Sequence, residues 1–589
     1  MNHDNSKQPP RTNYRLDSYS ESQILLSAST TSIVIMHILI AASMLFPVVN
    51  ATAQWLPCGI SVAVSDTMDK DLHALPSIEA DGQGGVFVCW QQHSTTDIFI
   101  AAQRISSDGR YLWSQSGQQV SFGDGVRTQE YAEMIADPYD GGVFIAWEYG
   151  PDLRVQKLDS SGRLLWPDNG TLASTISCYG ISMAADSLGG VFIGSRGYDT
   201  AGNFAPWLQH IDSQGTRIWG DEGIRLSNRN NKVRLRNVRV VSGPQPGTAI
   251  VCWAEGSASN NEDQTWAQLF NGDGQSRWTQ HGIPLSITPS GERDQVWAIS
   301  DGRGGAFVSW TSRGIHNEIV QHIDSTGALP LGKDGYFFCN GFEEYGMISD
   351  GSGGAIIAAN CWGPYGTKPN YYMQRITADN RVVWGDSIGT LILSPGANRD
   401  PGHNMILDGQ GGVWYANGGK GLQSIFMQRI DSNRIPMYGP DGLLVCQIPS
   451  GQRSYFDIAA TAPGELMLSW MDFRFGTTNA YVAKISVDGV VGIREIAVPS
   501  SSALTLSDVY PHPAMLGSGI SCTLRDHGWV RLALCDINGR ELRVLSDGER
   551  PPGTFVVPIE SGGLTEGTYF ITASFGADVK VKKMLVIRR

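Results

Sequence analysis

The chain has 589 residues and a formal net charge of −13, so it lacks the basic footprint that binding to a phosphate backbone requires, and a nucleic-acid partner is disfavoured. Seventy glycines and 28 prolines in a chain that is 41% hydrophobic indicate a turn-rich, folded β protein rather than a disordered one. The length exceeds what one compact domain usually holds, which favours several small units.

The N-terminal pattern is typical of an export signal. Residues 33–49 are almost entirely apolar, and the small residues Ala51 and Ala53 precede Gln54. Small residues at this spacing after an apolar run predict a signal peptide that is cleaved after Ala53. We therefore assign residues 1–53 to a signal peptide with a polar leader. A transmembrane anchor is the alternative, although about 17 apolar residues is at the short limit for a span.

A turn followed by a strand recurs along the rest of the chain. Its clearest copy is residues 81–90, DGQGGVFVCW, and the pattern returns about every 50 residues. Near-copies begin at Asp137, Asp186, Asp301, Asp350 and Asp408, and degenerate copies begin at Gly247 and Gly464. These eight units are repeats of one structural element.

Each unit has a second fixed part. A glutamine precedes an Asp-x-x-Gly turn, and in most units a tryptophan and a glycine follow, as in residues 103–117. Read as structure, a unit holds four short antiparallel strands joined by turns rich in Asp and Gly. Four strands per repeat predict the blade of a propeller, and a blade needs neighbours to bury its faces. We therefore expect an all-β chain in which residues 54–493 form an eight-bladed β-propeller.

The ends of the repeat region predict how the ring closes. The last unit lacks its Trp-x-x-x-Gly strand, whereas residues 55–62 at the mature N-terminus supply one. Trp55 and Gly59 have the same spacing as Trp113 and Gly117. We expect this N-terminal strand to complete the last blade.

The Asp-x-x-Gly-x-x-x-Trp segment resembles two known propeller repeats. It is similar to the tryptophan-docking repeat of quinoprotein dehydrogenases, which also builds eight blades, and to the Asp-box of sialidases, although its internal spacing differs from both. In both families the motif is structural, so the resemblance implies packing between blades and not catalysis. The tryptophans concerned are Trp113, Trp166, Trp219, Trp278 and Trp384.

Two sets of aromatic residues are candidate ligand-binding groups. Five tryptophans occupy one equivalent position at the end of the second strand of a unit, namely Trp90, Trp147, Trp253, Trp310 and Trp470. Rings near the central face of a propeller could stack on a sugar, and core or rim packing is the simpler interpretation. The second set lies in or beside the variable loop of the sixth unit and comprises Trp362, Tyr365 and Tyr371. Variable loops at one end of a rigid ring are where ligands commonly bind, and in this chain they are residues 93–97, 198–203, 256–263, 311–318 and 363–370.

Motifs for catalysis are missing from the sequence. It has no His-x-x-x-His or His-Glu pair for a metal, no Gly-x-Ser-x-Gly elbow, and no adjacent Cys-Cys pair of the kind that a quinoprotein enzyme would show. We therefore expect no enzyme activity, no metal and no cofactor. The Asp-Gly-x-Gly-Gly turns are interpreted as hairpin turns rather than calcium sites, because calcium loops place more oxygens per turn.

The nine cysteines are spread widely with no Cys-x-x-Cys pair, so burial as small hydrophobic residues is the default interpretation. A disulfide between Cys522 and Cys535 is possible in an exported protein.

The repeat pattern ends at residue 493. Residues 494–507 predict a linker, and residues 508–589 predict a small immunoglobulin-like β-sandwich. Its strands are expected at 520–524, 530–535, 554–559, 568–574 and 580–587.

This module resembles the type A sorting domain of the type IX secretion system in four landmarks: an opening Tyr-Pro-x-Pro, a Gly-Arg hairpin, a Gly-x-Tyr strand and a closing Lys-containing strand. The residues that carry the resemblance are Tyr510, Pro511, Pro513, Gly539, Gly567, Tyr569 and Lys583. His512 stands where the family has asparagine, which affects the opening turn alone. An ordinary β-sandwich that binds a ligand is the alternative.

The resemblance implies an exported protein of a Gram-negative bacterium, with the type IX secretion machinery as its partner and the cell exterior or outer surface as its destination. Contact with a membrane is then expected only during export or through surface attachment. The favoured hypothesis is a non-catalytic binding or scaffold protein for an extracellular glycan or protein. The alternative is a polysaccharide hydrolase or lyase that uses carboxylates of the central channel, which a deep pocket with two carboxylates would favour.

Overall fold

The computed structural model describes residues 60–61, 76–93, 98–114, 116–123, 129–227, 233–257, 263–287, 293–312, 317–361, 370–385, 389–393, 405–418, 424–438, 442–447, 453–472, 479–486, 504–507, 509, 518–536, 540–560, 563–565, 567–575 and 578–586. All regular structure in these residues is β-strand. They include no helix long and apolar enough to cross a membrane. The predicted signal peptide, with Ala51, Ala53 and Gln54, lies outside them.

The first and larger part of the fold is built from strands β1 to β31. They are β1 (Ile60–Ser61), β2 (Ser77–Ala80), β3 (Val86–His93), β4 (Ile98–Ile105), β5 (Gln118–Gln119), β6 (Gln129–Ala136), β7 (Val143–Tyr149), β8 (Asp152–Leu158), β9 (Thr171–Leu172), β10 (Ser177–Ala185), β11 (Val191–Tyr198), β12 (Phe204–Ile211), β13 (Ile224–Arg225), β14 (Val233–Ser242), β15 (Ala249–Ser257), β16 (Asp263–Phe270), β17 (Ile283–Pro284), β18 (Arg293–Ser300), β19 (Ala306–Ser312), β20 (Asn317–Ile323), β21 (Tyr336–Ser349), β22 (Ala355–Cys361), β23 (Asn370–Ile376), β24 (Thr390–Leu393), β25 (Met405–Leu407), β26 (Val413–Gly418), β27 (Ser424–Ile430), β28 (Leu443–Gln447), β29 (Arg453–Ala462), β30 (Glu465–Asp472) and β31 (Asn479–Ser486).

These strands form antiparallel sheets that follow the sequence repeat. Most sheets have four strands in chain order, such as β2-β3-β4-β5 and β6-β7-β8-β9, and β18 to β24 form one sheet of seven. In that larger sheet the long strand β21 pairs with β20 through its first half and with β22 through its second half. A single strand therefore serves two successive repeats.

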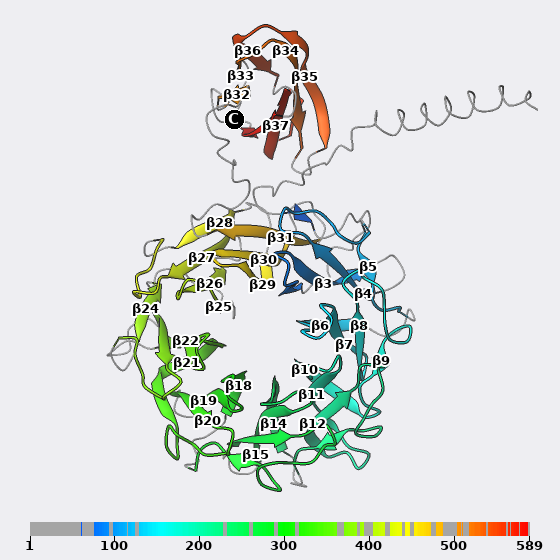
Figure 1. Cartoon of the computed structure of the whole chain (residues 1–589), viewed down its shortest axis with the longest axis vertical. Coiled ribbons are helices and arrows are strands. Elements are labelled where there is room, and N and C mark those ends of the chain that lie inside the picture. The colour runs from blue at the N-terminus through cyan, green and yellow to red at the C-terminus, as the bar shows by residue number, and fades with distance from the viewer. Residues whose placement is uncertain are drawn as a thin grey trace, which may run out of the picture. The chain divides into compact units, whose positions relative to one another are not determined.

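The sheets are arranged as a β-propeller (Figure 1). Their innermost strands contact one another in the cyclic order β2, β6, β10, β14, β18, β21, β25, β29 and back to β2. We call each repeat-sized sheet a blade. Each blade buries its faces against its neighbours, which is why a repeat of this size needs a ring.

The predicted ring closure is confirmed. The N-terminal strand β1 pairs antiparallel with β31, with Ile60 opposite Val482 and Ser61 opposite Tyr481, so the last blade has the order β1-β31-β30-β29. Trp55 and Gly59 lie outside the described residues. Side-chain contacts also cross the closing seam, because the Asp457 carboxylate accepts a hydrogen bond of 3.0 Å from the Ile78 amide.

The predicted packing of the repeat tryptophans between blades is confirmed. The indole N–H of Trp113 donates to the Ser160 carbonyl of the next blade at 3.2 Å, and Trp166 donates to the Ser213 carbonyl at the same distance. Trp219 and Trp278 make the corresponding bonds, at 2.7 and 3.2 Å. Trp384 is buried in a core cluster with Tyr415 of the following blade.

The C-terminal module is formed by β32 (Leu504–Leu506), β33 (Ser518–Leu524), β34 (Gly528–Cys535), β35 (Glu541–Arg550), β36 (Gly553–Ile559), β37 (Gly567–Phe575) and β38 (Asp578–Val586). They make two sheets, of order β32-β33-β36 and β35-β34-β37-β38, around one apolar core. The five predicted strands are present. Two others were not predicted, and β32 lies inside the segment assigned to the linker, so the ordered module begins before residue 508.

Of the sorting-domain landmarks, Gly567, Tyr569 and Lys583 are described. Gly567 opens β37, and Tyr569 is buried with its hydroxyl donating to the Thr565 carbonyl at 2.9 Å. Lys583 is exposed on β38. The other landmarks, Tyr510, Pro511, Pro513 and Gly539, lie outside the described residues.

The cysteine prediction needs a correction. Cys339 of β21 and Cys361 of β22 form a disulfide, whereas Cys522 and Cys535 are both free and buried. The possible 522–535 bridge does not form, because Cys522 packs into the apolar core of the module, whereas Cys535 lies outside that cluster with its thiol 3.8 Å from the Thr572 hydroxyl.

Candidate functional site

The five tryptophans considered as stacking surfaces are buried. Trp90, Trp147, Trp253, Trp310 and Trp470 are each at most 1% exposed and belong to the core clusters between blades. A ligand cannot stack on a ring with no accessible face, so core packing is the role that the structure assigns to them.

The glycine that ends the repeat explains this burial. A Cβ atom at Gly117 would lie 2.7 Å from Cη2 of Trp90, and one at Gly170 would lie 2.7 Å from Cη2 of Trp147. In each blade the tryptophan ring therefore occupies the space beside the glycine where any other residue would place its side chain.

The aromatic loop of the sixth unit is only partly described. Trp362 and Tyr365 lie outside the described residues. Tyr371 is 9% exposed and packs with its ring centroid 6.4 Å from that of Tyr415, so it also belongs to the core.

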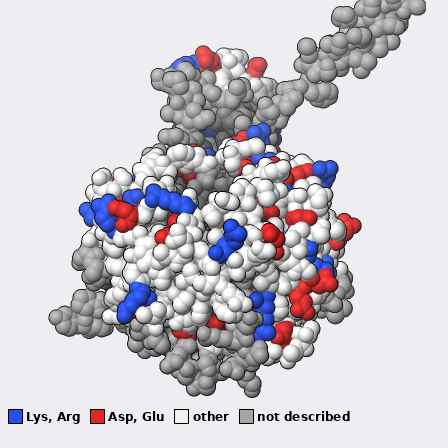
Figure 2. Space-filling view, turned by 60° about the horizontal axis from the view of Figure 1, so that its bottom comes forward, with Lys and Arg blue, Asp and Glu red and all other residues white. Residues whose placement is uncertain are grey.

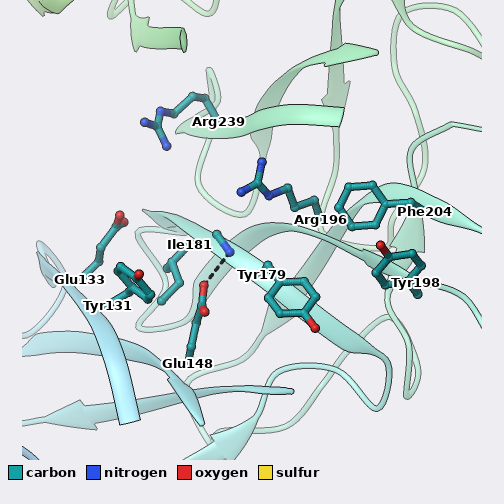
Figure 3. Close-up of a pocket in the computed structure, with 10 residues that line it drawn as sticks. Tyr131, Glu133, Glu148, Tyr179, Ile181, Arg196, Tyr198, Phe204 and Arg239 are labelled. Carbon is teal, nitrogen blue, oxygen red and sulfur yellow. Dashed lines mark hydrogen bonds between the residues drawn. The ribbon is translucent and has the colours of Figure 1, made fainter. Parts of the chain in front are cut away.

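A pocket of about 650 Å³ lies elsewhere, among strands of three consecutive blades (Figure 3). Its lining comes from β6 and β7 of one blade, β10, β11 and β12 of the next, and the innermost strand β14 of the third. This volume is in the range of sites that hold small ligands.

Two β-bulges shape the part of the pocket that β6 and β10 line. The pairing of β6 with β7 shifts between Glu130 and Glu133, and the pairing of β10 with β11 shifts between Tyr179 and Ser182. The bulges contain Tyr131 with φ 52° and Gly180 with φ 69°. A bulky residue with positive φ is strained, and bulges commonly re-aim side chains beside binding sites. Here they turn neighbouring side chains toward the pocket.

The aromatic part of the lining is accessible. Tyr131, Tyr179 and Tyr198 are 56%, 38% and 48% exposed, unlike the buried tryptophans. Tyr198 and Phe204 face each other across the β11–β12 hairpin with ring centroids 4.7 Å apart. These rings offer apolar faces together with phenolic hydroxyl groups.

The charged part of the lining contains two glutamates and two arginines. Glu148 accepts a hydrogen bond of 2.7 Å from the backbone amide of Gly180, which joins the two blades (Figure 3). Burial raises the pKa of Glu148, and the nearby Arg196 opposes this shift. Arg239 reaches the pocket from β14, where its guanidinium carbon lies 4.7 Å from the centre of the Trp297 ring.

Glu133 is an exposed residue of β6 that lines the pocket. Loss of hydration beside the neighbouring strands raises its pKa to about 7; Arg239 opposes the shift, whereas Asp457 and Glu148 add to it.

A second pair of acids lies at the closing seam of the ring. Burial raises the pKa of Glu79 to about 8, with a further contribution from Asp457. Burial also raises the pKa of Asp457 to about 6, against hydrogen bonds from the Ile78 and Ile458 amides and from Ser77. Within the described residues, no group of three or more His, Cys, Asp or Glu side chains is placed to hold a metal ion.

Sequence reasoning found one part of this pocket and missed the rest. The loop at 198–203 is one of five candidate loops, and of these it alone contributes to the described lining, through Tyr198. Tyr131, Tyr179 and Arg239 were not singled out, since they lie on innermost strands where the repeat is least regular. A signal that could have found the two tyrosines is that two consecutive units each have a tyrosine shortly before the turn aspartate, at Tyr131 before Asp137 and at Tyr179 before Asp186.

No protein-family model and no curated protein matches this sequence. Among solved structures, the Dos1 propeller is similar over 73% of this chain and 94% of its own, with 12% identity and a TM-score of 0.42. A puromycin hydrolase mutant complexed with PGG is similar over 80% of this chain, which spans 62% of that protein, with 13% identity and a TM-score of 0.37. The polysaccharide lyase Uly1 is similar over 74% of this chain and 98% of its own, with 11% identity and a TM-score of 0.34. At these values none of the similarities indicates an activity.

Proposed function

We propose that this protein is an exported, non-catalytic β-propeller that binds an extracellular glycan in the pocket between β6 and β14. The observation that carries the proposal is the set of exposed tyrosines, Tyr131, Tyr179 and Tyr198, in a pocket of about 650 Å³. Sugars present C–H faces to aromatic rings and hydroxyl groups to polar side chains, so tyrosines and charged groups in one concave site suit them.

The sheets of the ring and those of the C-terminal module both support the architecture that we propose for this binding protein. Counting the two halves of β21 separately, the order of the sheets favours a ring of eight blades. The two sheets of the C-terminal module, with the Tyr569 hydroxyl bonded four residues upstream, favour an immunoglobulin-like sandwich.

Export through the type IX secretion system is the route that we propose. The predicted signal peptide and the sorting-domain landmarks support it, and the Cys339–Cys361 disulfide is consistent with an oxidising compartment. In this proposal the C-terminal module is the sorting signal for export, and the propeller is the part that acts outside the cell.

Titration of oligosaccharides into the full mature chain tests the binding proposal. We expect saturable binding by isothermal titration calorimetry, with Tyr179→Ala and Tyr198→Ala each weakening it by about tenfold, which corresponds to about 1.4 kcal/mol. Tyr139→Ala is the matched control, because Tyr139 is 65% exposed and lies outside the pocket lining. The proposal would be contradicted if Tyr139→Ala weakened binding as much as the two pocket variants do. It would also be contradicted if neither neutral nor acidic oligosaccharides bound at all.

A second candidate function, a polysaccharide hydrolase or lyase, is favoured by one observation. The pocket contains two carboxyl groups, Glu133 and Glu148, both with raised pKa values, and acid catalysis at glycosidic bonds uses a carboxyl of this kind. Release of shorter oligosaccharides during the titration, abolished by Glu133→Gln, would establish this function in place of simple binding.

A further inference from the structure

The aromatic side chains of the pocket lie on successive strands of two blades. Tyr131 lies on β6, Tyr179 on β10 and Tyr198 on β11, where its ring packs against that of Phe204 from β12. The strands β6 and β10 contact each other across the boundary between the blades, and β10, β11 and β12 are paired in this order. Tyr198 is opposite Ser177, two residues along β10 from Tyr179, and such diagonal neighbours lie about 7–8 Å apart.

The pocket therefore offers three aromatic positions rather than one cluster, namely Tyr131, Tyr179, and Tyr198 together with Phe204 (Figure 3). A sugar ring stacks its C–H face on one aromatic position at a time. A single sugar can cover only one of the three positions, whereas consecutive sugars of a chain can cover all of them.

We propose that the pocket binds an extended glycan chain through at least three consecutive sugar units, with one unit on each aromatic position. This inference rests on the proposed glycan-binding function and names the class of glycan, a chain rather than a single sugar or a disaccharide.

The backbone at Tyr131 supports a ligand contact at the β6 end of this row. Tyr131 and Gly180 occupy the same position in two consecutive repeats, each six residues before the turn aspartate, Asp137 or Asp186. Both lie in bulges and both have positive φ, 52° and 69°. Glycine adopts this conformation readily, whereas a bulky residue is strained in it. Strained residues cluster at ligand-binding sites, where function maintains them.

Packing in the core does not account for a tyrosine at this position. The Tyr131 side chain is 56% exposed, whereas its neighbour Ala132 is 7% exposed and packs into the core between the blades. An exposed ring that lines the pocket, at a position where the next repeat has glycine, is therefore assigned to ligand contact.

Isothermal titration calorimetry with oligosaccharides of one to six units tests the number of positions. The probes are the glucose, N-acetylglucosamine and galacturonic acid series, titrated into the full mature chain. For a series that binds, we expect the affinity to rise about tenfold with each unit up to three, because each added unit gains one aromatic contact. Beyond three units the affinity should rise little.

Removal of the end position should shorten this dependence. Tyr131→Ala should move the plateau from three units to two and leave the affinity for the two-unit oligomer unchanged. Tyr139→Ala is the control, because Tyr139 is 65% exposed outside the pocket lining, and it should keep the plateau at three units.

A matched substitution separates binding from backbone strain. Tyr131→Gly should lose the same binding as Tyr131→Ala but unfold at a temperature about 1–3 °C higher, because glycine is not strained at φ 52°. At an ordinary strand position the order is reversed, since glycine is less stable than alanine there. Gly180→Ala should lower the unfolding midpoint by a similar amount, because φ is 69° and the nearest neighbour of a Cβ, Nε of Arg196, is at an ordinary contact distance of 3.6 Å.

Equal affinity for one unit and for three would overturn this inference and leave the glycan-binding function intact. The assignment of Tyr131 fails if Tyr131→Ala keeps the plateau at three units, or if it is as stable as Tyr131→Gly. No binding by any of the three series, at any length, would instead overturn the proposed function itself.

Discussion

At the scale of single residues, the aspartate of the repeated turn has two tasks. In the first blade, Oδ1 of Asp81 accepts backbone hydrogen bonds of 2.8 Å from Gln83 and Gly85, which shapes the turn, while Oδ2 pairs with Arg104 on the third strand at 2.9 Å. The equivalent pairs in other blades are Asp137–Lys157, Asp186–His210, Asp301–His322, Asp350–Arg375 and Asp408–Arg429. These carboxylates are engaged by protein donors, which agrees with the interpretation of the motif as a turn.

Asp186 shows the energetic consequence of these contacts. Burial tends to raise its pKa, but hydrogen bonds from His210 and from the Leu188 and Gly190 amides outweigh burial and hold the pKa below its ordinary value of 3.8. The folded state therefore favours the ionised form. This stabilisation is complete above the unfolded-state pKa and is lost as the pH falls through the lower folded-state pKa.

Replacement of this carboxylate tests that balance. We expect Asp186→Asn to reduce the free energy of unfolding at pH 7 by about 1–3 kcal/mol, because the amide keeps one acceptor but loses the charge that His210 faces. The difference from the wild type should shrink between pH 4 and pH 2. Urea unfolding at each pH measures it, with Asp273→Asn at an exposed turn as control. A difference that is the same at pH 2 and pH 7 would contradict the pKa argument.

At the scale of the element, the glutamine, the tryptophan and the Asp-x-x-Gly turn form one interlocking unit. The side chain of Gln156 accepts a hydrogen bond of 3.0 Å from the backbone amide of Trp166 and donates one of 3.0 Å to the Pro167 carbonyl. These two bonds fix the segment that carries the tryptophan. The Trp166 ring then lies against Gly215 in the turn of the next blade, where φ is 78° and a Cβ would be 2.8 Å from Cγ of the ring. Position 215 therefore needs glycine for two reasons: the backbone has a positive φ there, and a side chain would overlap the Trp166 ring.

Two alanine substitutions separate these requirements. Gly220 lies in the same blade with φ 76° and has no neighbouring atom within 4 Å of a Cβ. Gly220→Ala should cost about 1 kcal/mol from backbone strain alone. Gly215→Ala should cost about 1–3 kcal/mol more because the methyl group overlaps the tryptophan ring. Equal destabilisation of the two variants in urea unfolding would show that the ring contact is unimportant.

At the scale of the whole molecule, the closing strand comes from one end of the propeller segment and its partners come from the other. The strand β1 begins at Ile60, only a few residues after the predicted cleavage site, so the expected mature N-terminus retains it.

Figure 2 shows that acidic and basic side chains are interspersed among uncharged residues on the described part of one face, as on an ordinary solvated surface.

The termini of the exported chain test the proposed route. Intact-mass measurement of protein from the culture medium and from the cell surface should give a species that begins at Gln54 and ends near residue 500. Removal of the C-terminal module should leave the thermal unfolding midpoint of the propeller within a few degrees of the full-length value, because the closing strand is retained. Accumulation inside the cell, or an external species that still ends at Arg589, would contradict the sorting role.

The sequence by itself determined the repeat, the strand content and the closing strand. These follow from local chemistry: Gly and Asp where turns need positive φ, apolar runs where strands are buried, and a missing strand at one end matched by an extra one at the other. The burial of Trp90 and its equivalents was the simpler of two sequence interpretations, and the Gly117 contact gives its reason.

Only the tertiary structure decided the pocket and the disulfide. Tyr131, Tyr198 and Arg239 are far apart in sequence and on different blades, and Tyr131 lies in a bulge whose position no local pattern specifies. The raised pKa of Glu133 includes a charge contribution from Asp457, which is more than 300 residues away in the sequence, so it depends on the closed ring. Local signals determine which elements form, whereas the side chains that meet at one site depend on the register and bulges of several strands packed together.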